Sequence, residues 1–256
     1  MTEWYREDVA YIHDVGHADF ALQSAPGILE ILAESGIREG LVVDLGCGSG
    51  LLARELLDAG YGVLGIDISE AMVELARRRA PEAEFRVGSL FDAEVPPCAA
   101  VTAVSEVLNY LFDPQDEGLG PLFGRIYDAL VPGGAFVFDV LGPGQVPEGV
   151  AAKSFRVGED WAVLSDKEED SQRRTLTRRI TSFRRVGEHY RRDDEVHRLR
   201  LYGSSDIARE LRRVGFRVRT MAAYGRYPLP RAHAAFVARK VGGLREASRT
   251  ELAEGI

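Results

Sequence analysis

The sequence has few cysteines and no long apolar run. Its 256 residues include only two cysteines, Cys47 and Cys98, so no disulfide framework is implied and a reducing compartment is expected. No stretch approaches the roughly 20 apolar residues that span a bilayer. The polar, acidic N-terminus also lacks the basic and apolar regions of a secretory signal. These absences predict a cytoplasmic protein without membrane contact.

A positive net charge is absent as well. The 40 acidic residues outnumber the 32 Lys and Arg residues, which gives a formal net charge of −8. A protein that grips nucleic-acid phosphates needs a basic surface. The charge balance therefore argues against a nucleic-acid partner and favours a small-molecule or protein substrate. The length is sufficient for one α/β domain with an elaboration.

A glycine-rich turn is the most informative feature that is present. An apolar strand over residues 41–45 leads into Gly46, Gly48 and Gly50, and a helix is expected over residues 51–59. Such glycines let a ligand approach the backbone N–H groups closely. The spacing is G-x-G-x-G, whereas dinucleotide-binding proteins carry G-x-G-x-x-G. The turn therefore predicts a nucleotide site, with an NAD-dependent enzyme as a remaining alternative.

A carboxylate follows the next strand. Residues 62–66 form a second apolar strand that ends at Asp67, about 20 residues after the turn, where an acid can accept hydrogen bonds from both ribose hydroxyls. The alternative is structural. In that interpretation Asp44 braces the loop and Asp67 caps the helix that begins near Ser69.

The two strings D-L-G-C-G-S-G (44–50) and G-I-D-I-S (65–69) resemble the first two motifs of the class I S-adenosylmethionine (SAM) dependent methyltransferases. The resemblance implies that the chain binds SAM and releases S-adenosylhomocysteine (SAH). Ser89 stands where many relatives have an acid that contacts adenine, and Asp92 is a possible substitute. The implied cofactor-binding residues are Tyr11, Asp44, Gly46, Cys47, Gly48, Gly50, Asp67, Ile68, Ser89, Leu90 and Ser105.

Strands and helices alternate along the first part of the chain. Strands are expected at 41–45, 62–66, 84–87, 99–104 and 135–140, the last after a Pro-Gly-Gly turn at 132–134, and helices at 28–35, 51–59, 70–79 and 119–130. This order predicts a parallel sheet with helices on both faces. The resemblance adds a terminal antiparallel hairpin. The expected fold is therefore a doubly wound α/β protein with a seven-stranded, mostly parallel sheet.

The pattern of apolar and charged residues changes near residue 151. Apolar and charged residues alternate there, which predicts an antiparallel β insertion after the fifth strand. By analogy with the family, this insertion roofs the substrate. We divide the chain into an N-terminal helical cap (1–40), a SAM-binding core (41–150), the insertion (151–202), a segment that completes the core (203–240) and a tail (241–256).

Residues after the fourth strand are candidates for chemistry. Methyl transfer is an in-line displacement that needs alignment, desolvation and at most one base. The carboxyl ends of parallel strands open onto the ligand crevice, so Glu106 or Asn109 is predicted to orient the acceptor or to take its proton. The alternative is that both residues only shape the loop.

Histidines supply the other candidates. Glu195 and His197 share one face of a strand and would form a proton-abstracting pair if that face looks inward; the alternative is an exposed ladder of charges. The resemblance implies an N-terminal lid in which Tyr11, His17 or Phe20 lines the site. His13 and His17 lack a third ligand, so no metal site is predicted. Tyr202 and His233 are secondary pocket candidates.

Arginine pairs at 173/174, 178/179, 184/185 and 191/192 could bind an acidic substrate, but neighbouring acids favour a self-paired sheet. The leading hypothesis is a metal-independent methyltransferase, monomeric or homodimeric, that acts on nitrogen or oxygen of a small molecule. The alternatives are a protein or RNA methyltransferase and a non-catalytic SAM-binding module.

Overall fold

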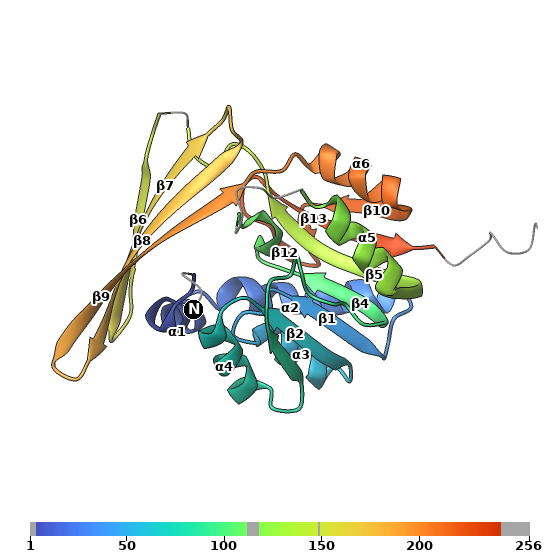
Figure 1. The fold of residues 1–256 in the computed structure, drawn as a ribbon, viewed down its shortest axis with the longest axis horizontal. Helices are drawn as coiled ribbons and strands as arrows, with labels where there is room; N and C mark the ends of the chain where they lie inside the picture. Colours follow the sequence, from blue (N-terminus) through green and yellow to red (C-terminus); the bar gives the residue numbers. More distant parts are fainter. Residues whose placement is uncertain (1–3, 112–117, 148, 242–256) are drawn as a thin grey trace, which may run out of the picture.

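The computed structural model describes residues 4–111, 118–147 and 149–241. The predicted tail at 241–256 therefore lies outside the described residues, except for Val241. Two sheets dominate the molecule, one covered by helices and one that stands apart from it (Figure 1). No helix among the described residues is long and apolar enough to cross a membrane.

The larger sheet has seven strands in the order β10-β13-β5-β4-β1-β2-β3. Its first five strands in the chain run parallel, whereas β13 is antiparallel to both β5 and β10. This confirms the predicted doubly wound sheet with a terminal antiparallel hairpin. The strands are β1 (Leu41–Leu45), β2 (Gly62–Asp67), β3 (Glu84–Val87), β4 (Cys98–Ala103), β5 (Leu130–Leu141), β10 (Phe216–Met221) and β13 (His233–Lys240).

Alternate residues of the central strands pack into two separate hydrophobic cores, one on each face of the sheet. Val42 of β1 packs beneath α2, α3 and α4, whereas Val43 and Leu45 pack beneath α5 and α6. Both faces are thus apolar, which is why the strands read as continuous hydrophobic runs. The helices are α1 (Glu7–Gly16), α2 (Asp19–Glu34), α3 (Leu51–Asp58), α4 (Glu70–Arg79), α5 (Gly120–Ala129), α6 (Ser204–Val214) and the short 3-10 helix η1 (Val107–Asn109).

The first long helix differs from the prediction. A helix was expected to begin at residue 28 after Pro26-Gly27, but α2 begins at Asp19 and contains Pro26. Proline removes one helical hydrogen bond, yet burial of Ala25, Ile28 and Leu32 in the hydrophobic core outweighs that loss. Gly27 is required there, because a Cβ would lie 2.3 Å from the backbone of Tyr224.

The Pro-Gly-Gly turn also takes another form. It was expected to precede the fifth strand, but β5 begins earlier, at Leu130. Leu130 pairs with Cys98 and Ala135 with Ala100, so residues 131–134 form an irregular excursion within the strand. The turn chemistry was read correctly, whereas the strand boundary was not.

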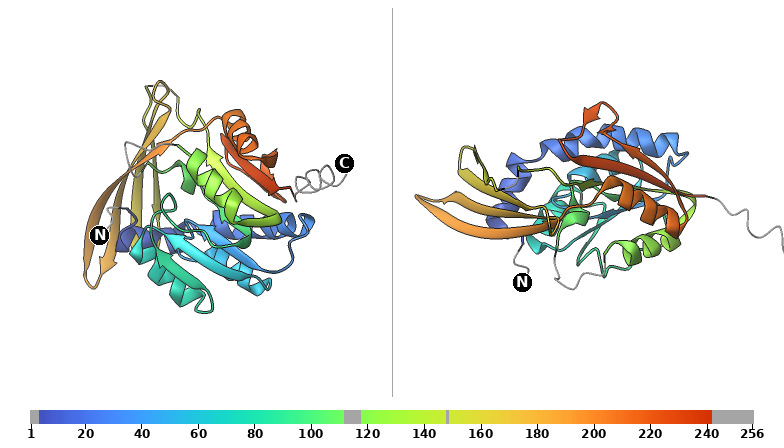
Figure 2. Two further views of the ribbon diagram at one scale, coloured as in Figure 1. Left: turned by 45° about the vertical axis from the view of Figure 1, so that its right-hand side comes forward. Right: turned by 90° about the horizontal axis from the view of Figure 1, so that it is seen from above.

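The insertion is a four-stranded antiparallel sheet, which we call the roof sheet. It consists of β6 (Ala152–Val157), β7 (Trp161–Asp170), β8 (Thr175–Val186) and β9 (His189–Arg200), paired in that order. The roof sheet stands beside the larger sheet, with α1 between them (Figures 1 and 2). A bridge between Tyr110 and Leu199 ties it to the core. A small hairpin, β11 (Ala223–Tyr224) and β12 (Tyr227–Pro228), packs near α2.

Candidate functional site

The glycine turn lies at the carboxyl end of β1 and is fixed to β2. The N–H groups of Gly46 and Cys47 both donate to the carbonyl of Ile66, at 2.7 and 3.1 Å. Gly48 has a positive φ of +53°, and nothing lies within 4 Å of the position that its Cβ would occupy. The turn is therefore held rigidly while one side of it stays open to a ligand.

Asp67 follows β2 beside this turn. Its two oxygens accept N–H bonds from Gly48 and Ser69, each at 2.9 Å. Burial raises the pKa of this carboxyl. Since a carboxylate has about four acceptor positions, each oxygen retains capacity for one ligand hydroxyl.

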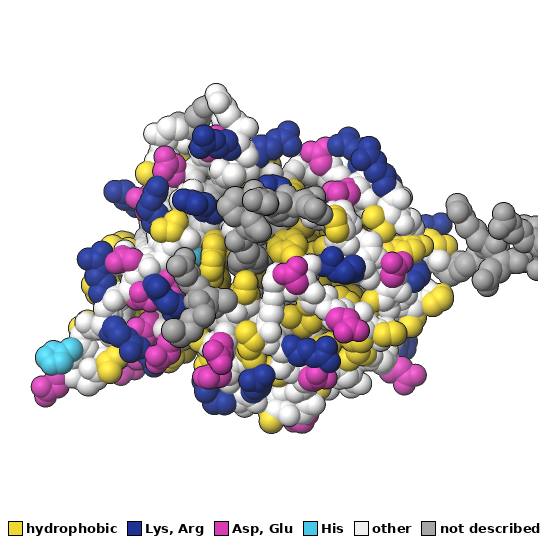
Figure 3. All heavy atoms as spheres, in the orientation of Figure 1, with side chains coloured by type: hydrophobic (Ala, Val, Ile, Leu, Met, Phe, Trp, Pro, Cys, Tyr) yellow, Lys and Arg dark blue, Asp and Glu magenta, His cyan; other side chains and the backbone are white. Residues whose placement is uncertain are grey.

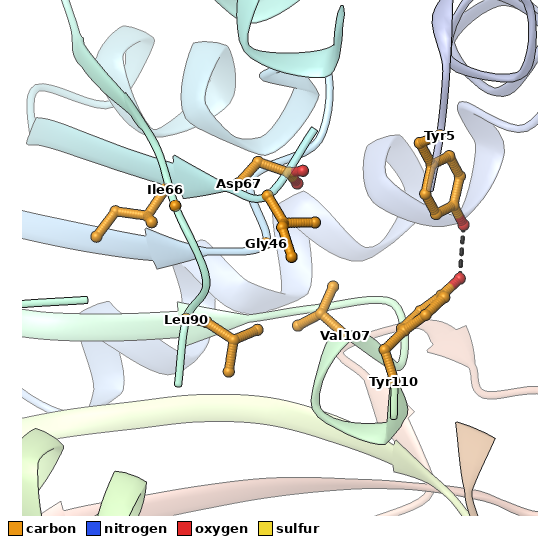
Figure 4. A pocket seen from close by; sticks show the side chains of 9 residues that line it. Tyr5, Gly46, Ile66, Asp67, Leu90, Val107 and Tyr110 are labelled. Atoms are coloured by element: carbon orange, nitrogen blue, oxygen red, sulfur yellow. Dashed lines mark hydrogen bonds between the residues drawn. The ribbon is translucent and has the colours of Figure 1, made fainter. Parts of the chain in front are cut away.

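A small pocket surrounds Asp67. Apolar side chains form most of its wall, and Tyr5 and Tyr110 close one side, with their hydroxyls 2.6 Å apart (Figure 4). A carboxylate beside flat apolar walls suits a nucleoside, whose ribose is polar and whose base is flat. The pocket is lined by Tyr5, Gly46, Ile66, Asp67, Ile68, Gly88, Leu90, Val107 and Tyr110.

Asp44 lies under the turn and is buried. The Thr102 hydroxyl donates to it at 2.6 Å. Burial, opposed in part by this hydrogen bond, raises the pKa of Asp44 to about 7. A cationic ligand group that approached Asp44 would favour its ionised form.

A second, larger cavity of about 850 Å³ also reaches Asp67. The glycine turn, the loop after β4, α1, α2 and the roof sheet all contribute to its walls. Glu106 lies in it and bonds Arg178 at 2.7 Å, with His233 Nε2 at 3.6 Å. Although burial raises the pKa of Glu106, Arg178 and His233 lower it to about 2. Glu106 is therefore a fixed negative charge and a weak base.

An unanticipated acid holds Glu106 in place. Ser105 and Glu106 both have positive φ values, 70° and 57°, which are strained for residues other than glycine. Their N–H groups donate to the two oxygens of Asp139, at 2.8 Å each, and Tyr224 donates to the same carboxylate at 3.1 Å. An acid inside the apolar strand 135–140 was the sequence signal for this role.

Asn109 does not face the cavity. Its amide NH₂ donates to the carbonyls of Leu141 and Arg200, and its oxygen accepts the N–H of Leu141 at 2.9 Å. The side chain is fully buried. Asn109 therefore fastens η1 to β5 and β9, and the contact with the acceptor predicted for it is not formed by this arrangement.

Glu195 and His197 form a pair, with 2.8 Å between Oε2 and Nε2, but it is covered. Trp4 stacks on the His197 ring, with 5.1 Å between centroids. Glu195 accepts the N–H groups of Tyr5 and Arg6, each at 2.8 Å. The pair thus anchors residues 4–6, which we call the N-terminal strap, and lines neither cavity.

His13 of α1 and His17, which directly follows α1, do face the larger cavity. The rings of His13 and His17 stack with 5.7 Å between their centroids. Burial lowers the pKa of His13 to about 4 and also lowers that of His17. Both imidazoles are neutral at pH 7, and neither Nδ1 has a hydrogen-bond partner.

Tyr11 turns away from both cavities. Its hydroxyl donates to Asp160 at 3.1 Å, and the Arg184 guanidinium lies 3.8 Å from the ring centroid. Tyr5 occupies the position expected for Tyr11. No motif marked Tyr5, because its contacts come from residues far away in sequence.

Ser89 caps a turn, accepting the N–H of Phe91, and Asp92 is exposed. Gly50 packs against Ala76. The predicted residues that line a cavity are Asp44, Gly46, Cys47, Gly48, Asp67, Ile68, Leu90, Ser105, Glu106, His17, Phe20 and His233. Those that line neither are Tyr11, Gly50, Ser89, Asn109, Glu195, His197 and Tyr202.

Comparison with known proteins agrees with this geometry. Residues 42–134 match the family described as methyltransferase domain. The chain is 37% identical over 113 residues to ubiquinone biosynthesis O-methyltransferase of Alkalilimnicola ehrlichii, covering 41% of this chain and 43% of that protein. It is 29% identical over 142 residues to the 18S rRNA (guanine-N(7))-methyltransferase of Bos taurus, covering 51% and 49%.

The fold extends the likeness over most of the chain. A crystal structure of a SAM-dependent methyltransferase from Clostridium acetobutylicum superimposes with a TM-score of 0.77 at 21% identity, covering 91% of this chain and 98% of that one. Residues 42–134 therefore match the methyltransferase domain family, and the chain shares its fold with a SAM-dependent methyltransferase. The carboxylate, open turn and apolar walls around Asp67 fit an adenosyl group.

Proposed function

We propose that this protein is a methyltransferase that transfers the methyl group of SAM to a nitrogen or oxygen atom of a small-molecule acceptor. The observation that carries the proposal is the larger cavity, which begins at the glycine turn and ends at the roof sheet. Its volume of about 850 Å³ suits a small ligand beside the amino-acid end of SAM. An RNA or protein acceptor needs an open surface groove instead.

The charge distribution also supports a small acceptor. On the face shown in Figure 3, acidic side chains lie among the Lys and Arg side chains. Together with the formal net charge of −8, this mixture gives little electrostatic support for a phosphate backbone.

The residues divide into two groups in this proposal. Asp67 accepts the ribose hydroxyls, while Ile68 and Leu90 pack on the base. Asp44, the turn at 46–48 and the backbone at Ser105 hold the amino-acid end. SAM supplies an electrophilic methyl group on its sulfonium.

Glu106 orients the acceptor, because its charge is fixed by Arg178. The His17 imidazole takes the acceptor's proton, since burial keeps it neutral and it lines the cavity. Displacement at a sulfonium methyl depends on alignment and desolvation, so no metal is assigned a role.

The test is a two-step measurement. Calorimetric titration with SAM, SAH and NADH establishes the cofactor, and a panel of amines and hydroxyl compounds is then screened for SAH formation. Glu106→Gln should lower kcat more than it weakens SAM binding. Methylation of RNA or protein alone would instead support a macromolecular acceptor. SAM binding without any methylated product would identify a non-catalytic module.

A further inference from the structure

The inward face of the roof sheet carries an excess of positive charge. Alternate residues of β6, β7 and β8 point into the larger cavity, as the period of two requires. Within this set are three cations and three serines but no acid. The residues are Ser154, Arg156, Val163, Ser165, Lys167, Arg178, Ile180 and Ser182.

Three hydrogen-bond donors on this face lack partners. Lys167 of β7 lies directly opposite Arg178 of β8, and Ser165 is two residues from Lys167 on the same strand. The Ser165 hydroxyl and Arg178 Nε are buried without a hydrogen-bond partner. Within the described ranges the Lys167 side chain forms no hydrogen bond or ion pair. Unsatisfied buried donors are costly, so this arrangement is explained if a ligand satisfies them.

The nearby acids do not neutralise this cluster. Glu106 is already paired with Arg178 and His233, and Arg156 donates to the Gly16 carbonyl. Asp193 and Glu195 lie on the same face of the roof sheet but bind Arg6 and the strap backbone. Asp19 lines the cavity from α2. The positive charge of Lys167 therefore has no carboxylate of its own.

The outward face of the same strands shows the contrast. Arg179, adjacent to Arg178 in sequence, pairs with Glu168 at 3.2 Å, and Arg192 pairs with Asp194 at 3.1 Å. These two outward cations thus have acidic neighbours, as the sequence predicted for the arginine pairs. Arg184 and Arg191, further along the inward face, are paired with Asp8, so Lys167 differs from both groups in having no ion pair.

We propose that Lys167, Arg178 Nε and the Ser165 hydroxyl form a subsite for an anionic group on the acceptor, either a carboxylate or a phosphate ester. This inference rests on the proposed function, because it describes the acceptor of the same cavity. Arg178 takes part both in the acceptor-orienting pair and in the anion subsite. Its Nη2 group donates to Glu106, and its Nε belongs to the proposed subsite. The acceptor carries its nucleophile and its anion as separate groups.

The first test uses matched acceptors. Pairs of amines and hydroxyl compounds that differ only in a free acid versus its methyl ester, or a phosphate versus its alcohol, are assayed for SAH formation. We expect the anionic members to be methylated at least tenfold more efficiently.

Lys167→Met should raise KM for anionic acceptors roughly tenfold or more while leaving the SAM affinity intact. Lys167→Arg should restore most of the loss, and Arg179→Met is the matched control. Preference for neutral members, or equal loss on both members in Lys167→Met, would refute the subsite.

A second test needs no methyl transfer. SAH-saturated protein is titrated with inorganic phosphate and with acetate, and binding is followed by NMR shifts in the wild type, Lys167→Met and Arg179→Met. Saturable binding in the wild type and Arg179→Met, with at least a tenfold loss in Lys167→Met, supports the subsite. Identical binding in all three proteins, or none in any, overturns it. Because this readout is independent of turnover, a failure of the proposed function remains distinguishable from a failure of the subsite.

Discussion

Two buried carboxyl groups and one half-buried carboxyl group shape the site at the level of single residues. Asp44, Asp67 and Asp139 belong to β1, β2 and β5, and burial raises the pKa of each. Ionised carboxylates in such positions are costly without full compensation. These acids therefore make the fold less stable at neutral pH, but they face ligands or hold strained backbone in place.

The pH dependence of stability should reveal Asp44. Its pKa is about 7 in the folded protein and 3.8 ordinarily, so the folded state binds more protons between those values and loses stability as pH rises through this window. Asp44→Asn does not titrate and should be roughly 1 to 3 kcal/mol more stable than the wild type at pH 8, with the gain shrinking toward pH 4. Thermal unfolding of the cofactor-free protein measures this. Asp92→Asn, at an exposed position, is the control, and an equal gain at every pH would contradict the assignment.

Asp67 should dominate cofactor affinity. Asp67→Ala removes two acceptors for ribose hydroxyls and also frees the N–H groups of Gly48 and Ser69. Each charge-assisted bond contributes about 1.5 to 3 kcal/mol, so SAM and SAH binding should weaken by at least tenfold. Calorimetry measures the change, with Asp92→Ala as control. Unchanged affinity in Asp67→Ala would show that the carboxylate only supports the turn.

The N-terminal strap is the element that closes the small pocket. Glu195 holds its backbone from the roof sheet, and the Ser69 hydroxyl donates to the Tyr5 carbonyl at 2.7 Å from the core. Tyr5 itself has a positive φ of 49°, so its backbone is strained. The strap is therefore held by a few specific bonds, and loss of one should release it.

The Glu195→Gln substitution tests whether these bonds hold the N-terminal strap in place. Glutamine has one carbonyl oxygen and cannot accept both strap N–H groups as the carboxylate does. We expect SAH to dissociate several-fold faster, because release of the strap moves Tyr5 away from Tyr110 and opens the small pocket more often. Stopped-flow displacement of SAH by excess SAM gives the rate. Asp194→Asn, on the neighbouring exposed position, should leave the rate unchanged. An identical rate in Glu195→Gln would mean that cofactor release follows another route.

Elements were predictable to the extent that local pattern determined them. The apolar runs at 41–45 and 62–66 specify buried parallel strands, and Ser69 caps α4 through the N–H of Met72 as its position suggested. The start of α2 was not predictable, because tertiary burial outweighs the local cost of Pro26. Local pattern also could not show that Arg178 faces inward and Arg179 outward, since both neighbours in sequence are arginines.

At the scale of the whole molecule, the site is assembled from three distant parts of the chain. Glu106, Arg178 and His233 meet although long stretches of sequence separate them. The glycine turn and Asp67 were recognisable because their roles depend on one strand–turn–helix unit. Tyr5, Asp139 and Lys167 acquire their roles only through long-range packing, which a single sequence does not encode in any local motif.

The two sheets should differ in backbone protection. All six residues of β6 are exposed and the strand lies at an edge of the roof sheet, whereas β4 and β5 are buried at the centre of the larger sheet. Amides of β6 should exchange with deuterium orders of magnitude faster than those of β4. Hydrogen exchange with mass spectrometry measures this, with β3, the edge strand of the larger sheet, as reference. Equal protection of β6 and β4 would indicate that the roof edge is covered in solution.

The strap has a kinetic consequence. Tyr5 and Tyr110 lie across the pocket proposed for the nucleoside, while the acceptor is proposed to occupy the larger cavity beyond the sulfonium. A cofactor would then enter before the strap closes, and the acceptor would follow into a compartment that the closed strap helps to complete. Turnover would thus follow a compulsory order, in which the methylated product departs first and the spent nucleoside leaves last.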